Sequence, residues 1–110
     1  MEHNVINIAN AIDHKIKQLE IMRAEIKGRA IAKAEAISNY DRSLTKHIIL
    51  LKEKGSPTTI VEKIARGECW SERYDMELAD GLYKSLISNM TCIQAELNGL
   101  QSINRHLSEL

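Results

Sequence analysis

Apolar side chains recur along this chain at alternating spacings of four and three residues, in two long stretches. In residues 5–54, one set repeats every seven residues and a second set follows each member of the first by four. The first set comprises Val5, Ile12, Leu19, Ile26, Lys33, Tyr40 and His47, and the second Ala9, Ile16, Arg23, Ala30, Ile37, Leu44 and Leu51. Such spacing is typical of the contact seam of a coiled coil. The pattern predicts a long helix over about residues 4–54.

The second stretch, at about residues 69–108, has the same period. Its two sets comprise Ala79, Leu86, Ile93, Leu100 and Leu107, and Met76, Tyr83, Met90, Leu97 and Asn104. No segment alternates apolar and polar residues with the period of two that a half-buried strand shows. We therefore expect an all-α fold with a second long helix over residues 69–108.

Turn signals gather between the two stretches. Gly55 can adopt the left-handed conformation that closes a helix, and Ser56 followed by Pro57 is a helix start signal. A short helix over about residues 57–66 follows, with Gly67 placed to end it. We expect the large side chains at this bend to pack together, namely those of Trp70, Tyr74, Ile60, Ile64, Ile48 and Leu51.

Together these elements predict one helical domain over residues 1–110, a long antiparallel hairpin with a short helix at its bend. Residues 1–55 carry 10 basic and 7 acidic side chains, and residues 56–110 carry 5 and 8, which favours antiparallel pairing of the two arms. Gly28 is expected to mark a kink or a close helix crossing. Because one hairpin leaves a side of each apolar stripe uncovered, we expect a homodimer that forms a four-helix bundle.

Composition narrows the classes of partner. The formal net charge of zero removes the simplest argument for nucleic acid or an anionic membrane as a partner. No apolar run is long enough for a membrane span, and the start, Met-Glu-His-Asn, has no signal-peptide features. We therefore expect a cytoplasmic protein without membrane contact, in which Cys69 and Cys92 are unpaired, buried thiols.

Motifs for catalysis and cofactor binding are missing from the sequence. There is no glycine-rich phosphate loop, no Gly-x-Ser-x-Gly turn, and no Cys near a positionable His and acid. The acidic group at Glu68, Glu72 and Asp75 lacks the Glu-x-x-His repeat of bundle metal sites and is expected to complement the dipole of a helix start. We expect no enzyme activity, no cofactor and no metal.

Two segments resemble small all-helical proteins encoded by bacteriophages and prophages. They read Thr-Thr-Ile-Val-Glu-Lys-Ile-Ala-Arg-Gly at residues 58–67, followed by Trp70, and Gln-Ala-Glu-Leu-Asn-Gly-Leu-Gln-Ser-Ile-Asn-Arg-His-Leu at residues 94–107. The resemblance implies a setting in which small proteins without catalytic groups work by binding. Such proteins inhibit host defence nucleases, as anti-CRISPR proteins do, or assist phage recombination and replication proteins.

The sequence leads to one main hypothesis and two alternatives. The main hypothesis is a non-catalytic phage-type protein-binding module that inhibits a host defence complex in the bacterial cytoplasm. Its partner-binding surfaces would be the bend, with Lys63, Arg66, Trp70 and Tyr74, and the acidic start of the second arm, with Glu68, Glu72, Asp75 and Glu77. The alternatives are a DNA-binding or accessory factor for phage recombination or replication, using the basic face of the first arm, and a structural coiled-coil element.

Overall fold

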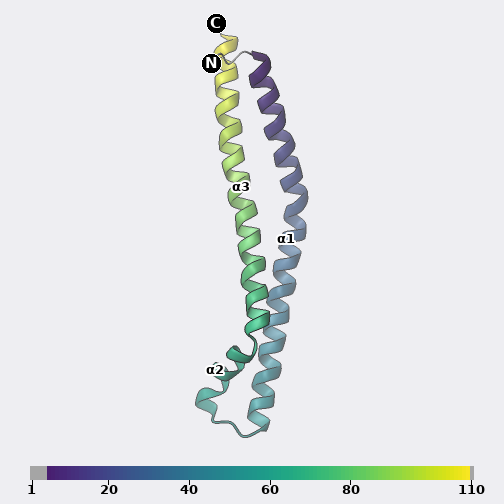
Figure 1. Ribbon diagram of the computed structural model, residues 1–110, viewed down its shortest axis with the longest axis vertical. Helices are drawn as coiled ribbons and strands as arrows, with labels where there is room; N and C mark the ends of the chain where they lie inside the picture. The colour runs from purple at the N-terminus through teal and green to yellow at the C-terminus, as the bar shows by residue number, and fades with distance from the viewer. Residues whose placement is uncertain (1–4, 110) are drawn as a thin grey trace. The chain divides into compact units, whose positions relative to one another are not determined.

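The structure, a computed structural model, describes residues 5–109. It consists of three helices, α1 (Val5–Glu53), α2 (Thr58–Glu68) and α3 (Trp70–Ser108), and the described residues contain no strand (Figure 1). The all-α prediction is confirmed, and the helix bounds agree with the predicted ones to within two residues. The predicted first position of the first helix, residue 4, lies outside the described residues.

Contacts group the chain into two compact units. In one, described residues within 5–27 pair with those within 84–109, so the start of α1 packs against the end of α3. The other is Gly28–Tyr83, which holds the rest of α1, all of α2 and the start of α3. In both units the paired segments of α1 and α3 run antiparallel, which confirms the hairpin pairing. Helix α1 continues through Gly28, and a Cβ atom there would meet nothing within 4 Å, so no other helix of the described residues crosses closely at that glycine.

A small apolar core holds the first unit together. Leu19, Ile93 and Leu97 are buried, and Ile12, Met22 and Met90 pack against them. Burial of each large aliphatic side chain contributes about 1.5–3 kcal/mol. At the edge of this core an ion pair joins Lys15 of α1 to Glu96 of α3. Apolar contact therefore supplies most of the attraction here, and the ion pair helps to set which residues face each other.

The contact seam of α3 agrees with its predicted repeat. Each of the ten predicted positions, from Met76 to Leu107, is buried or half-buried. Helix α1 differs, because the prediction for its second set is wrong over residues 9–37: Ile16 and Ile37, for example, are both 38% exposed. The inward positions lie three residues after the first set, not four, and are occupied by Ile8, Lys15, Met22, Ala36 and Ser43.

A lysine in the α1 seam has partners that explain its position. The Nζ atom of Lys33 lies 3.0 Å from Oδ1 of Asp80 and 5.1 Å from the ring centroid of Tyr83. A cation over an aromatic face and beside a carboxylate keeps its charge compensated while its aliphatic stem packs along the seam. These contacts belong to the second unit and align Lys33 of α1 with Asp80 of α3.

Helix α1 closes as the turn signals predict. Gly55 has a φ of 79°, and its N–H donates to the Lys52 carbonyl at 3.0 Å. The N–H of Ser56 donates to the Leu51 carbonyl at 3.1 Å, which completes a Schellman motif. Ser56 was expected to cap the short helix, but the capping residue of α2 is Pro57 and no side chain bonds there. The side chain of Ser56 therefore does not cap α2, while its backbone N–H completes α1.

Helix α2 also runs past Gly67, the residue expected to end it. The N–H of Cys69 still donates to the Ala65 carbonyl at 3.1 Å, so the helical hydrogen bonding continues through Gly67. Cys69 alone separates α2 from α3, and the N–H of Arg73 in turn donates to the Cys69 carbonyl at 3.0 Å. The two helices therefore join with no loop between them.

The expected cluster of large side chains at the bend is wrong. Trp70 is 71% exposed and Tyr74 is 62% exposed. The side chains that fill the contact are small ones at spacings of four, Val61, Ala65 and Cys69, and all three are buried. Because successive helical residues are turned by about 100°, a helix that turns Cys69 inward directs Trp70 away from that contact.

Among the helices of the described residues, none has the length and apolar content that a membrane span needs.

Candidate functional site

One hollow in the second unit lies between α2 and the first turns of α3, and we call it the aromatic groove. Its volume is about 690 Å³. It is lined by Thr59, Glu62, Lys63, Arg66, Gly67, Trp70, Arg73, Tyr74 and Glu77. The groove forms because α2 and α3 meet at the single residue Cys69, so that side chains of both helices surround the junction.

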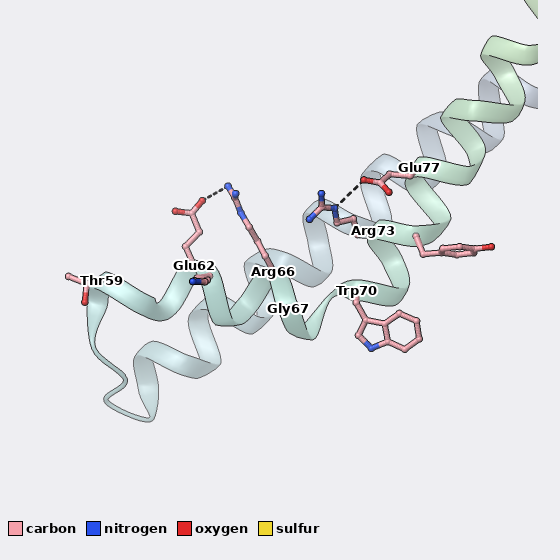
Figure 2. Close-up of a pocket in the computed structure, with 9 residues that line it drawn as sticks. Thr59, Glu62, Arg66, Gly67, Trp70, Arg73 and Glu77 are labelled. Carbon is pink, nitrogen blue, oxygen red and sulfur yellow. Dashed lines mark hydrogen bonds and ion pairs between the residues drawn. The ribbon is translucent and has the colours of Figure 1, made fainter.

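Two aromatic rings give the groove its apolar surface. Trp70 and Tyr74 stand one helical turn apart at the start of α3, so they lie on the same side of that helix. Figure 2 shows the Trp70 ring projecting away from the ribbon. Large aromatic side chains left in water are a cost unless a partner covers them, since burying apolar area is worth about 25 cal/mol per Å².

The charged residues of the groove are arranged in two ion pairs. Arg66 lies 2.6 Å from Glu62 on α2, and Arg73 lies 3.2 Å from Glu77 on α3 (Figure 2). Each pair spans four residues along one helix, and both are exposed. The groove therefore offers guanidinium groups held in place by carboxylates, with Lys63 as a third cation. Its charge is mixed, which is unlike the uniform positive surface that tracks a nucleic-acid backbone.

The structure divides the eight residues predicted from the sequence among three places. The aromatic groove contains Lys63, Arg66, Trp70, Tyr74 and Glu77. Glu72 and Asp75 line a different hollow, beside α1. Glu68 lies near His47 of α1, with 3.8 Å between its Oε2 atom and Nε2 of the ring. The predicted acidic start of the second arm is therefore not a single patch.

Sequence reasoning missed four residues of the groove, Thr59, Glu62, Gly67 and Arg73. A signal for two of them was present in the sequence. Glu62 stands four residues before Arg66, and Arg73 four before Glu77, which is the spacing of ion pairs on one helix face. What the sequence lacked was the direction in which α3 leaves Cys69, which places both ion pairs and Trp70 around one hollow.

A second polar cluster lies under the junction of α2 and α3 and involves Cys69, His47 and Ser43. The Sγ atom of Cys69 lies 3.4 Å from Nδ1 of His47 and 3.3 Å from Oγ of Ser43. With Glu68 near the other ring nitrogen, the structure does place a Cys beside a His and an acid. The prediction that no such arrangement exists was wrong, because the fold brings His47 to the adjacent residues Glu68 and Cys69, the latter 22 residues away in sequence.

The hydrogen bonding of His47 decides what this cluster can do. Nδ1 lies 2.8 Å from the carbonyl oxygen of Ser43, which only accepts hydrogen bonds, so Nδ1 carries a proton and donates it there. A nitrogen that already carries its proton cannot accept one from the Cys69 thiol. Cys69 is also 0% exposed. The cluster therefore ties the junction of α2 and α3 to α1.

The second thiol of the chain lies elsewhere. Cys69 and Cys92 are both unpaired, as expected, and Cys69 is buried, but Cys92 is exposed on α3. The expectation of burial was therefore wrong for Cys92. Its neighbour Ile93 is the residue that the α3 repeat turns inward, and one step along a helix leaves the seam.

Metal binding and similarity to other proteins add no further assignment. Within residues 5–109, no group of three or more His, Cys, Asp and Glu side chains is placed to hold a metal ion. No protein-family model, no curated protein and no solved structure matches the chain.

Proposed function

We propose that this chain is a non-catalytic protein-binding module whose aromatic groove takes a segment of another protein. The observation that carries the proposal is the exposure of Trp70 and Tyr74 beside the held guanidinium groups of Arg66 and Arg73. Trp, Tyr and Arg are the residue types that dominate the energetics of protein interfaces. Four of them surround one hollow here.

A DNA-binding role, which the sequence left open, has less support at this groove. Aromatic rings beside cations do bind single-stranded nucleic acid, with bases stacked on the rings and phosphates on the cations. Arg66 and Arg73 are already paired with carboxylates, so a phosphate would have to displace Glu62 and Glu77 or accept their repulsion. A protein segment with mixed charge meets no such obstacle.

The resemblance to phage proteins suggests which partner to test first. We propose that the module works as a homodimer in the cytoplasm of a bacterial host, where it inhibits a defence complex. Proteins of phage recombination or replication are the alternative partners. In either setting the same groove would make the contact, so one set of variants tests both.

The experiment compares capture by a groove variant with capture by a control of similar exposure. Tagged wild-type protein, the double variant Trp70→Ala/Tyr74→Ala and the control Ile21→Ala/Ile103→Ala are incubated with nuclease-treated lysates of host cells. Ile21 and Ile103 are exposed residues of α1 and α3 outside the groove. Recovered proteins are identified by mass spectrometry. We expect the groove variant to lose its partner and the control to keep it.

A second measurement uses the only tryptophan of the chain, Trp70. Because this ring lies in the groove, its fluorescence should change when the purified partner binds to the wild-type protein. Truncating two central interface residues should weaken binding roughly thirtyfold or more, since even one such residue is worth about 2 kcal/mol. Equal recovery of the partner by both variants would refute the groove as the binding site. A fluorescence response to single-stranded DNA that is lost at moderate salt would favour the DNA alternative.

A further inference from the structure

The second unit has another hollow, on the side where α1 and α3 lie together, and it is separate from the aromatic groove. Its floor is formed by the small residues Ala32, Ala36 and Ala79, and Leu78 and Leu82 stand at its rim. The two leucines are 48% and 40% exposed. This hollow shares Ala32, Ala36 and Asp75 with a larger one that continues along α1 to Leu50. We call the two together the inter-helix face.

Charges on this face are sorted between the two helices. Arg42 and Lys46 line it from α1, and Glu72 and Asp75 line it from α3. Glu35 is an exception on the α1 side. The α1 side is thus mainly basic and the α3 side acidic, although the whole chain has no net charge.

The contacts of the unit fix how these charges are aligned along the helix axes. Lys33 pairs with Asp80, and Ser43 contacts Cys69. Arg42 and Glu72 both lie between these two contacts, and counting residues from either one puts them at nearly the same height. The same count places Leu78 and Leu82 level with residues 31–35 of α1, beside the alanines.

From this arrangement we propose that the inter-helix face binds a second copy of this chain, related by a two-fold axis parallel to the helices. Such a rotation leaves heights unchanged and lays α1 of each copy on α3 of the other. Arg42 then faces Glu72 of the second copy. Leu78 and Leu82 of each copy enter the space above Ala32 and Ala36 of the other, as knobs into a surface of small residues. The inference gives a face and an orientation to the homodimer proposed above.

The size of the face suits a stable dimer. It extends from Arg29 to Leu50 along α1, which is roughly 30 Å of helix, and two helices side by side are about 20 Å wide. A face of roughly 600 Å² is comparable with the 800 Å² or so that each partner buries in a standard interface. Burial of further apolar surface at such an interface would also stabilise the chain, because only nine hydrophobic residues among those described are buried.

The alignment of the charges favours a second copy of this chain as the occupant of the face. Any other helical partner would have to present acids against α1 and bases against α3 at matching heights. This chain presents that pattern to itself by symmetry. Electrostatic complementarity of this kind selects partner and register more than it adds affinity.

Charge reversal tests the proposal in a form that separates contacts between copies from contacts within one. The variants are Arg42→Glu, Glu72→Lys and the double variant carrying both. In either single variant each symmetric pair becomes repulsive, and we expect the dissociation constant of the dimer to rise roughly tenfold or more, measured by analytical ultracentrifugation. The double variant should dimerise again.

Mixing the two single variants is the decisive step. One copy then carries Arg42→Glu and the other carries Glu72→Lys, so both contacts of a mixed dimer pair opposite charges. We expect a heterodimer from two variants that are separately monomeric, whereas an Arg42–Glu72 contact within one chain would be restored only in the double variant. Circular dichroism of each variant checks that the helices form.

Two results would overturn the inference. One is a wild-type protein that stays monomeric at all accessible concentrations, and the other is a dimer whose dissociation constant the reversals leave unchanged. The variant Leu82→Glu provides a second test at the other end of the face and should also produce monomers. Since Trp70 and Tyr74 lie outside this face, their double alanine variant should remain dimeric, so that failure of partner binding and failure of dimerisation are told apart.

Discussion

The two long helices turn their apolar residues toward each other in different ways. Along α3 the inward positions hold Leu86, Ile93 and Leu97, all buried, and neighbouring positions of the repeat are nearly all apolar. Along α1 the inward positions include Lys15, Lys33 and Ser43, while four isoleucines in the same part of the helix remain exposed, namely Ile16, Ile21, Ile31 and Ile37.

This difference shows how polar contacts select among apolar faces. Helix α3 turns the predicted stripe inward, although Leu78 and Leu82 beside it stay exposed, whereas the apolar arc of α1 is wide enough for two adjacent faces. The face that α1 uses carries Lys15 opposite Glu96 and Lys33 opposite Asp80. Turning Ile16 and Ile37 inward would move Lys15 away from Glu96, whereas Lys33 belongs to the first set and faces inward in either arrangement. The apolar residues left outside are then available to a second molecule.

The largest expected difference between two regions is in the reaction rates of the two thiols. Cys69 is buried where α2 meets α3, while Cys92 is exposed on α3. We expect one thiol per native chain to react quickly with a colorimetric disulfide reagent and the other at least a hundredfold more slowly, since a buried thiol reacts only through opening of the structure. In the variant Cys92→Ser the fast phase should vanish. A fast phase that remained would show that the junction of α2 and α3 opens freely.

Alanine substitutions at neighbouring apolar positions of α1 test which face is used. Leu19 is buried and Ile16 is exposed, although both belong to the predicted repeat. Leu19→Ala should lower the free energy of unfolding by about 2–5 kcal/mol, because it leaves a cavity in the core. Ile16→Ala should cost less than about 1 kcal/mol. Urea denaturation followed by circular dichroism measures both, and equal losses would show that α1 turns its other face inward in solution.

Replacing either of two glycines, one within α1 and one just after it, by alanine should change the free energy of unfolding in opposite directions. Gly55 has a φ of 79°, a conformation that costs an L-residue about 1–2 kcal/mol, so Gly55→Ala should destabilise the protein by that amount. Gly28 is helical with open space around its Cβ position. Gly28→Ala should therefore stabilise it by about 0.5–1 kcal/mol. Thermal unfolding of the two variants gives both signs, and destabilisation by Gly28→Ala would reveal a packing role for that glycine.

The smallest effect concerns the ion pair between α1 and α3 in the first unit. Lys15→Met removes the charge but keeps most of the aliphatic stem that packs along the seam. Because the pair is partly exposed, we expect a loss of about 0.5 kcal/mol at low salt and less at high salt. Lys17→Met, at an exposed pair within α1, serves as the matched control. A gain in stability from Lys15→Met would show that apolar packing, without the ion pair, selects this face.

The candidate site was only partly predictable, because it too depends on how helices meet in space. The sequence indicated Trp70, Tyr74, Lys63 and Arg66 as residues of the bend, and the structure places them around one groove. It did not indicate that Trp70 would be exposed, or that Glu68, Glu72 and Asp75 would separate from Glu77. Those outcomes depend on the direction in which α3 leaves Cys69, and a single residue between two helices carries no periodic signal.

By itself the sequence determined the helices, the left-handed glycine at the end of α1 and the contact seam of α3. These follow from local conformational preference and from a repeat with one strong apolar stripe, and neither needs knowledge of a partner. Only the tertiary structure decided which face of α1 turns inward, how Cys69 meets His47 and Ser43, and where the acidic residues point. Those features depend on contacts between residues far apart in the chain, where several apolar faces were available and polar pairing selected among them.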